Sequence, residues 1–213
     1  MNKILLIFAT LIFPFALQAQ ELKPVEVESE RDFLQKLAAN NAKTETIVCN
    51  FEQEKHVSML AKPVEMNGTF FYKRGNRIFM HYDNPKNDKL ILNEESFFIV
   101  ANGNITRTDA KSNPGMKMLK EMLTACMTGD LEQFSGASRS KLSLFESAKN
   151  YVAVVEIEDK RIKKYLEKMT LTFEKSDLSL FELKIDEAHG NFTKYKFSNK
   201  KFNQPIDDII FEF

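Results

Sequence analysis

The sequence has 213 residues, and its 30 Lys and Arg side chains balance its 30 Asp and Glu side chains, so the formal net charge at pH 7 is zero. This balance argues against a nucleic-acid partner, because nucleic-acid phosphates select strongly basic surfaces. The chain contains 19 Phe, 9 Met and no Trp. The length of the chain and its many Phe and Met side chains are sufficient for one domain with a sizeable core.

The first 19 residues have the pattern of a cleavable secretory signal. Lys3 precedes an apolar run from Ile4 to Phe15, and a small residue stands at Ala19. The run is shorter than the ~20 residues that a membrane-spanning helix needs. We therefore expect residues 1–19 to be removed on export, and residues 20–213 to form a single domain that is either soluble or a β-barrel.

A helix and several strands are predicted after a polar tail. Apolar residues recur at helical spacing on one face of residues 31–41. The hydrophobic period then changes to two, which predicts a half-buried strand at 47–54. The segment 68–85 is predicted to form two strands around a Gly-Asn turn, and shorter strands are expected at 89–92 and 96–100.

Residues 114–134 interrupt this alternation with a predicted Met-rich helical segment. Gly115 and Gly129 mark the ends of its helix, and residues 130–134 are expected to form a further short helical turn. Methionine side chains adapt to their surroundings, so a Met-rich face is typical of surfaces whose packing must change. The apolar residues that recur at helical spacing are Met118, Leu119, Met122, Leu123, Cys126 and Met127.

From Lys141 onwards the sequence alternates again between apolar and polar residues. Short strands of this kind, apolar on one face and charged on the other, indicate an antiparallel sheet that is curled or closed. The two helices are the elements that can cover its apolar face. We therefore expect a mainly β (α+β) fold with ten or eleven strands. The clearest alternating segments in this half are 151–157, 169–173, 181–185, 193–197 and 209–213.

One set of apolar side chains is expected to share the concave face of this sheet. In the strand after the Gly-Asn turn, Ile78, Met80 and Tyr82 point one way, while Arg77, Phe79 and His81 point the other. Each residue by itself fits a conventional core, whereas the abundance of Met favours an adaptable binding surface. The full set is Ile78, Met80, Tyr82, Phe181, Leu183, Ile185, Tyr195 and Phe197.

The sequence has no pattern that indicates catalysis, a metal or a cofactor. Its three histidines have no metal-ligand spacing to one another or to Cys and carboxylate residues. Phosphate-binding, dinucleotide-binding and serine-hydrolase motifs are absent from the sequence. Cys49 and Cys126 are interpreted as buried free thiols that act as small hydrophobes, with a disulfide as the alternative in an oxidising compartment.

The segment 47–100 reads I-x-x-x-F-x-Q and then G-x-F-x-Y-K-R, and two further strands follow. With these motifs it resembles the outer-membrane lipoprotein carrier, or LolA, family, and the two strands that follow agree with the same pattern. Gly75 stands where the family often has Pro, so a paralogue with another lipid cargo also fits. The residues that carry the motifs are Ile47, Phe51, Gln53, Gly68, Phe70, Tyr72, Lys73 and Arg74.

The resemblance implies an unclosed, strongly curved antiparallel half-barrel with helices over its concave apolar face. It also implies a monomeric periplasmic carrier for the acyl chains of lipoproteins, or of a related lipid. Such a carrier is loaded by an inner-membrane release complex and unloaded by an outer-membrane acceptor. Arg74 matches a position that contacts the lid and responds to cargo. We assign the mobile lid to residues 116–134, with Met118, Leu119, Met122 and Leu123 facing the cavity.

Two other functions remain open at this point. The chain ends in Ile-Ile-Phe-Glu-Phe, which is common in outer-membrane β-barrels, although charges such as Glu182, Lys184 and Lys194 would burden a lipid-facing band. The other alternative is a lipid-modifying hydrolase with an unrecognised site. The identity of the cargo is not specified by the sequence.

Overall fold

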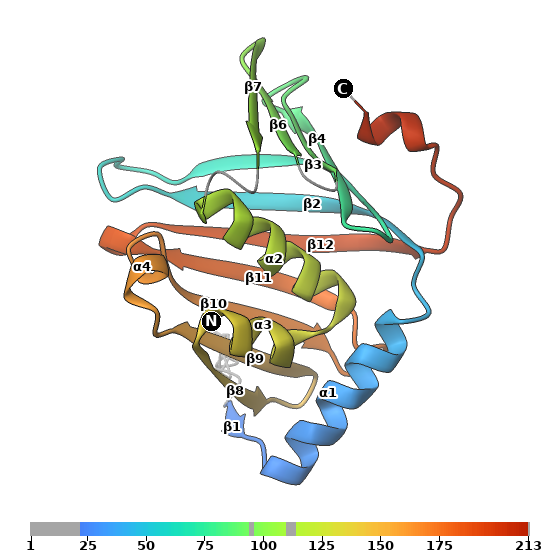
Figure 1. Ribbon diagram of the computed structural model, residues 1–213, viewed down its shortest axis with the longest axis vertical. Helices are drawn as coiled ribbons and strands as arrows, with labels where there is room; N and C mark the ends of the chain where they lie inside the picture. The colour runs from blue at the N-terminus through green and yellow to red at the C-terminus, as the bar shows by residue number, and fades with distance from the viewer. Residues whose placement is uncertain (1–21, 94–95, 110–113, 213) are drawn as a thin grey trace, which may run out of the picture.

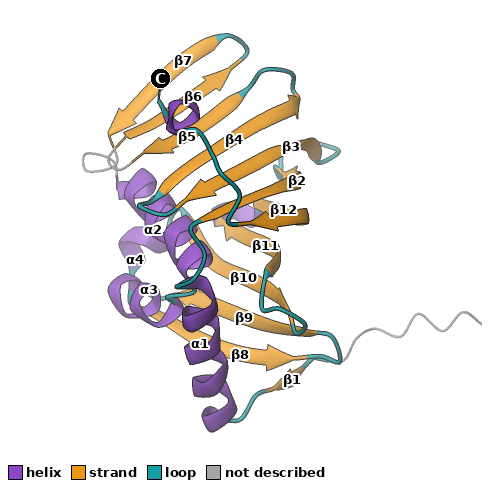
Figure 2. Cartoon of the chain, turned by 90° about the vertical axis from the view of Figure 1, so that its right-hand side faces the viewer, coloured by secondary structure: helices purple, strands orange, loops and turns teal. Residues whose placement is uncertain are grey.

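The computed structural model describes residues 22–93, 96–109 and 114–212, so the predicted signal at 1–19 lies outside the described residues. The strands form one 12-stranded sheet, in the order β1-β8-β9-β10-β11-β12-β2-β3-β4-β5-β6-β7. Strands β1 and β7 lie at its two edges, and the sheet curves strongly between them without closing (Figure 2). The fold is the predicted antiparallel half-barrel.

The described residues form twelve strands and four α-helices, with two short 3-10 turns. The strands are β1 Lys23–Pro24, β2 Thr46–His56, β3 Val64–Lys73, β4 Arg77–Asn84, β5 Lys89–Asn93, β6 Ser96–Ala101, β7 Asn104–Asp109, β8 Ser140–Glu146, β9 Asn150–Ile157, β10 Leu166–Glu174, β11 Leu180–Glu187 and β12 Phe192–Phe202. The helical elements are α1 Val27–Asn41, α2 Pro114–Thr128, α3 Leu131–Ser138, α4 Lys160–Lys163, η1 Ala188–Gly190 and η2 Asp208–Phe211.

The four α-helices lie on one side of the sheet, the concave side (Figure 2). Helix α2 runs diagonally across the middle strands, and its last turn comes close to the end of α1 (Figure 1). Helix α1 packs on the sheet through Phe33. The centroid of its ring lies 4.7 Å from the ring centroid of Tyr151 and 5.7 Å from that of Phe173. The helices therefore cover the apolar face, as the alternation of the strands requires.

The period-two pattern of β2 sets which residues face the helices. Cys49, Phe51 and Gln53 are buried, whereas Asn50 and Glu52 between them are exposed. Phe51 pairs with Gly68 on β3 on one side and with Phe197 on β12 on the other, so one apolar face continues across the neighbouring strands.

The first residue of the G-x-F-x-Y-K-R motif has a steric role. A Cβ atom at Gly68 would lie 1.9 Å from the carbonyl oxygen of His81. The pairing of β3 with β4 shifts register at this point, between Asn67 and Gly68. Only glycine allows the two backbones to approach so closely.

The C-terminal end differs from the predicted strand at 209–213. Residues 208–211 form η2, and Phe213 lies outside the described residues. Both sides of β12 are already paired, with β11 and β2, so the chain leaves the sheet after that strand. The turn is capped by Asp207, whose carboxylate accepts a hydrogen bond from the backbone N–H of Ile209 at 3.1 Å.

Three elements of the structure were not predicted. Strand β1 has only two residues, and β7 is largely exposed, so neither shows a hydrophobic alternation. Helix α4 has only four residues and begins after Asp159, whose side chain accepts from the backbone N–H of Arg161 at 2.8 Å. The described part of the chain has twelve strands instead of the predicted ten or eleven.

Candidate functional site

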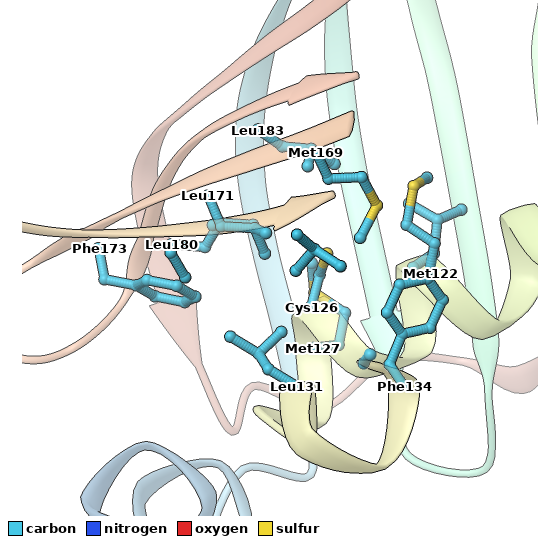
Figure 3. Close-up of a cluster of buried hydrophobic side chains, with 14 of the residues drawn as sticks. Met122, Cys126, Met127, Leu131, Phe134, Met169, Leu171, Phe173, Leu180 and Leu183 are labelled. Carbon is cyan, nitrogen blue, oxygen red and sulfur yellow. The ribbon is translucent and has the colours of Figure 1, made fainter. Parts of the chain in front are cut away.

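The concave face of the sheet is filled by apolar side chains from α2 and α3. Figure 3 shows these side chains pointing at residues of β10 and β11. All are at most 9% exposed. The helical residues are Met122, Cys126, Met127, Leu131 and Phe134, and the strand residues are Met169, Leu171, Phe173, Leu180 and Leu183.

A small void remains between the helices and the sheet. Its volume is about 30 Å³, and its lining includes Cys49, Phe70, Cys126, Phe173 and Phe197. That volume is close to the space of one or two water molecules. The structure is therefore a closed form, and a long acyl chain can enter this space only if helix side chains move out of it.

The predicted cavity residues lie on the helix-covered face, with one exception. Ile78, Met80, Leu183 and Phe197 are buried there, and Tyr82, Ile185 and Tyr195 are half-buried against the same core.

Phe181 is the exception, and its predicted place is corrected. A register shift between Thr172 and Phe173 pairs Glu182 with Thr172 but Leu180 with Phe173. The bulge therefore places Leu180 in the core, at 9% exposure, and leaves Phe181 37% exposed.

The predicted lid corresponds to α2, α3 and their connection. Met122 and Leu123 are 1% and 8% exposed and pack in the core. Met118 and Leu119 lie on α2 as predicted, but their side chains lie outside what the structure describes.

The end of α2 packs directly on the end of α1. Gly129 follows α2 with a φ of +73°, in the left-handed region. A Cβ atom there would lie 2.6 Å from Nδ2 of Asn41 and 2.8 Å from Cγ of Leu37. The two helix ends are therefore in contact at a position that only glycine can occupy without strain.

Arg74 holds the C-terminal end of α1. Its Nη2 donates to the carbonyl oxygens of Ala42 at 2.6 Å, Thr44 at 2.9 Å and Asn41 at 3.3 Å, and its Nε lies 2.8 Å from Oε1 of Glu45. Carbonyls at the end of a helix lack intrahelical partners and attract cations. These contacts place Arg74 on the end of α1, and α1 in turn contacts Gly129; a direct contact of Arg74 with residues 116–134 stays a prediction.

A polar cluster stands on the same concave face. The hydroxyl of Tyr82 donates to Oε1 of Gln53 at 2.9 Å, and the hydroxyl of Thr193 donates to Oε1 of Glu187 at 3.0 Å. Burial, followed by the charge of Asp88, raises the pKa of Tyr82 to about 12.

Tyr195 completes this cluster. It pairs with Gln53 across β12 and β2. Burial is the main cause that raises its pKa, followed by the charges of Tyr82 and Glu187 and a hydrogen bond with Tyr82. The two tyrosines were predicted on this face, whereas their connection to Gln53 was not. The sequence pattern does place Gln53 on this face, because Gln53 follows Cys49 and Phe51 at a spacing of two residues along the same strand.

Cys49 and Cys126 are free thiols, 3% and 2% exposed, as interpreted from the sequence. Burial raises the pKa of each to about 12. Within the described residues, no three His, Cys, Asp or Glu side chains are grouped as metal ligands. In the same residues, none of the helices combines the length and the apolar character needed to cross a membrane.

Comparison with known proteins agrees with the fold. An uncharacterized conserved protein from Thermus thermophilus superposes with a TM-score of 0.53 at 8% identity, over 87% of this chain and 94% of that chain. MucB superposes with a TM-score of 0.52 at 11% identity, over 86% of this chain and 62% of that chain. At these identities the likeness concerns the fold alone.

No curated protein matches the sequence. A family profile does match it over residues 42–213, which is most of the chain, and the family is described as "Outer membrane lipoprotein carrier protein LolA". The matched region runs from the end of α1 through the whole helix-covered sheet other than β1. This chain therefore belongs to the LolA family.

Proposed function

We propose that this protein is a periplasmic carrier that binds the acyl chains of lipoproteins, or of a related lipid, on the concave face of its half-barrel. The observation that carries the proposal is the Met-rich helix α2, with α3, packed on an apolar curved face. Its side chains occupy the space that hydrocarbon would take. Membership of the LolA family supports the same function.

The energetics of an acyl chain require such a site. Exposure of hydrocarbon to water costs about 0.8 kcal/mol per CH₂, so a sixteen-carbon chain costs roughly 12 kcal/mol. A carrier must offset most of this cost and still release the chain. Competition between helix side chains and cargo for one apolar face meets both needs. When the acyl chain leaves, the helix side chains cover the apolar face again, and when the acyl chain enters, it takes their place.

The lid roles follow from this competition. Met122 and Leu123, and by proposal Met118 and Leu119, cover the face in the closed form and leave it when cargo enters. Ile78, Met80, Tyr82, Leu183, Ile185, Tyr195 and Phe197 are the wall that would contact the chain. Arg74 would act on cargo release through α1, because it holds the helix end that touches Gly129.

The remaining features of the proposal concern location and partners. Residues 1–19 would direct export, and residues 20–213 would form one monomeric domain without catalytic activity. The carrier would take cargo from an inner-membrane release complex and pass it to an outer-membrane acceptor.

The test is recovery of cargo with the native protein. The full-length chain is expressed with its own N-terminus, and the periplasmic fraction is purified and analysed by native mass spectrometry and lipid extraction. We expect bound acyl species and their transfer to acceptor membranes. Protein that carries no acyl species and takes up none when they are supplied would contradict the proposal, and so would release of fatty acid from an ester.

A further inference from the structure

The polar cluster on the concave face is unusual for its position. Gln53 and Thr193 are only 7% and 6% exposed, yet they stand in a wall that otherwise consists mainly of apolar residues. Burial of a polar group is costly unless it is hydrogen-bonded. Gln53 is bonded to Tyr82, and Thr193 to Glu187, so the closed form meets part of this requirement internally.

The cluster lies where the cover of the sheet is thinner. Strand β2 starts beside the end of α1 and ends at His56, so Gln53 is near its far end. At the near end, Phe70 is 1% exposed, whereas Tyr82 and Tyr195 beside Gln53 are only partly buried. A cargo molecule lying along the concave face would therefore meet this cluster at the end of β2 that is farther from α1.

The cluster offers hydrogen-bond donors to an incoming group. Gln53 uses its side-chain oxygen in the bond from Tyr82, and its amide nitrogen carries two further N–H donors. The hydroxyl of Tyr195, which pairs with Gln53 across the strands, is hydrogen-bonded to Tyr82 in the closed form and would exchange that partner for the ligand. The matching ligand group is an acceptor without protons to give, such as a carbonyl oxygen.

The charges around the cluster select against an anion. The carboxylate of Glu187 accepts from Thr193, and both Glu187 and Asp88 interact electrostatically with the tyrosines. A carboxylate or phosphate placed here would be repelled by these two acids. The acceptor that fits is uncharged.

We infer that Gln53, Tyr82 and Tyr195 bind the ester carbonyl groups at the polar end of a neutral acyl ester, so that its hydrocarbon lies under α2 and α3. This inference rests on the proposed function and deepens it. It assigns the orientation of the cargo and favours neutral acyl esters over free fatty acids or anionic lipids of equal chain length.

The experiment compares three ligands that share one sixteen-carbon chain: methyl palmitate, palmitate and hexadecane. Each competes with a fluorescent acyl probe for the purified full chain at pH 8. We expect methyl palmitate to bind more tightly than palmitate. Tyr195→Phe should weaken methyl palmitate about five- to tenfold, the typical effect of one lost hydrogen bond, and leave hexadecane unchanged.

Tyr72→Phe is the matched control, because Tyr72 is buried at 3% exposure on the same face but at the other end of β3. It should alter none of the three affinities. Gln53→Met removes the amide donors at a similar side-chain volume. It should weaken the binding of methyl palmitate as Tyr195→Phe does, so the inference can still be tested if one of the two variants fails to fold.

Equal losses for methyl palmitate and hexadecane would overturn the inference, because the cluster would then contribute only packing. Tighter binding of palmitate than of methyl palmitate would also overturn it. Hexadecane binding without any ester preference overturns the inference but leaves the proposed carrier function intact, whereas failure of all three ligands to bind would overturn both.

Discussion

At the residue scale, Arg74 is the side chain that binds the end of α1. Three main-chain carbonyls at the end of α1 accept from its guanidinium, and Glu45 pairs with it. Its side chain is 43% exposed, so the interactions are partly screened by water. Their importance comes from position, because the same helix end contacts Gly129 at the end of α2.

Arg74→Leu should lower the free energy of unfolding by about 1–2 kcal/mol, because the carbonyls of α1 lose a charged donor. Urea denaturation measures this change. Arg31→Leu, an identical substitution at an exposed position on α1, is the control and should stay within about 0.5 kcal/mol of wild type. Equal effects of the two substitutions would show that the contacts of Arg74 contribute nothing specific.

The rate at which the thiols of Cys49 and Cys126 are alkylated can be used to measure opening of the lid. Burial raises the pKa of Cys49 and of Cys126 from 9.0 to about 12. At pH 8 the thiolate fraction therefore falls from about one in ten to about one in ten thousand. We expect iodoacetamide to alkylate the native protein at least about 100-fold more slowly than the urea-unfolded protein, and an acyl ligand that displaces α2 to increase the rate.

Single Cys49→Ser and Cys126→Ser variants separate the two sites in this assay. Native alkylation as fast as that of the unfolded chain would contradict the buried thiols. The same shifts predict alkaline lability, since a thiol that stays protonated in the folded state stabilises it fully below pH 9. That contribution is lost as the pH rises from about 9 to about 12.

At the scale of elements, the C-terminal turn η2 packs on the convex face of the sheet, the face opposite the α-helices. Lys73 and Arg77 both pair with Asp208, and the guanidinium of Arg77 lies 5.7 Å from the ring centroid of Phe211. The Nδ2 of Asn93 donates to the carbonyl oxygen of Phe211 at 3.1 Å. Three strands of the sheet are thus tied to the end of the chain.

Phe211→Ala should destabilise the protein by about 3–5 kcal/mol, because Phe211 is 2% exposed and its ring would leave a cavity. Ile209→Ala lies in the same turn but at a residue that is 66% exposed, and should have little effect. Thermal and urea unfolding measure both. Similar stability of the two variants would mean that η2 does not pack as described.

The contact between the ends of α1 and α2 can be tested through Gly129. Gly129→Ala places a methyl group against Asn41 and Leu37 at a φ of +73°, a conformation that costs a non-glycine residue about 1–2 kcal/mol. If α2 competes with cargo, this loosening should increase acyl affinity while it lowers stability. Gly136→Ala has nothing within 4 Å of its new atom and should instead stabilise α3 by up to about 1 kcal/mol.

Most strands and the covering helices could be predicted, because their alternation is local. Residues 47–54, 151–157 and 169–173 all lie in strands of the structure. The place of Phe181 could not be predicted, since a bulge depends on how the partner strand pairs. The hydrogen bond of Gln53 joins residues from β2 and β4, and the local pattern indicates the face of each but not their register.

At the scale of the whole molecule, the half-barrel leaves one apolar face that helices cover without a covalent constraint. Among the described residues, both cysteines are free, so no disulfide between them fixes α2 to the sheet. The sheet is continuous from β1 to β7 and is held by main-chain pairing. The molecule therefore has a frame held by main-chain pairing and a cover that, in the described residues, no disulfide fixes to it, which is the division that a carrier requires.

This division predicts a pattern of hydrogen exchange. When a saturating acyl ligand is added, amides of α2 and α3 should lose protection because cargo takes the place of Met122, Cys126 and Phe134 on the concave face. Amides of β9 and β10 should keep theirs, since the ladder between these strands does not depend on the lid. Exchange followed by mass spectrometry resolves these segments. Greater protection of α2 with ligand would show that cargo binds beneath a closed cover, and that competition for the face is not the mechanism of release.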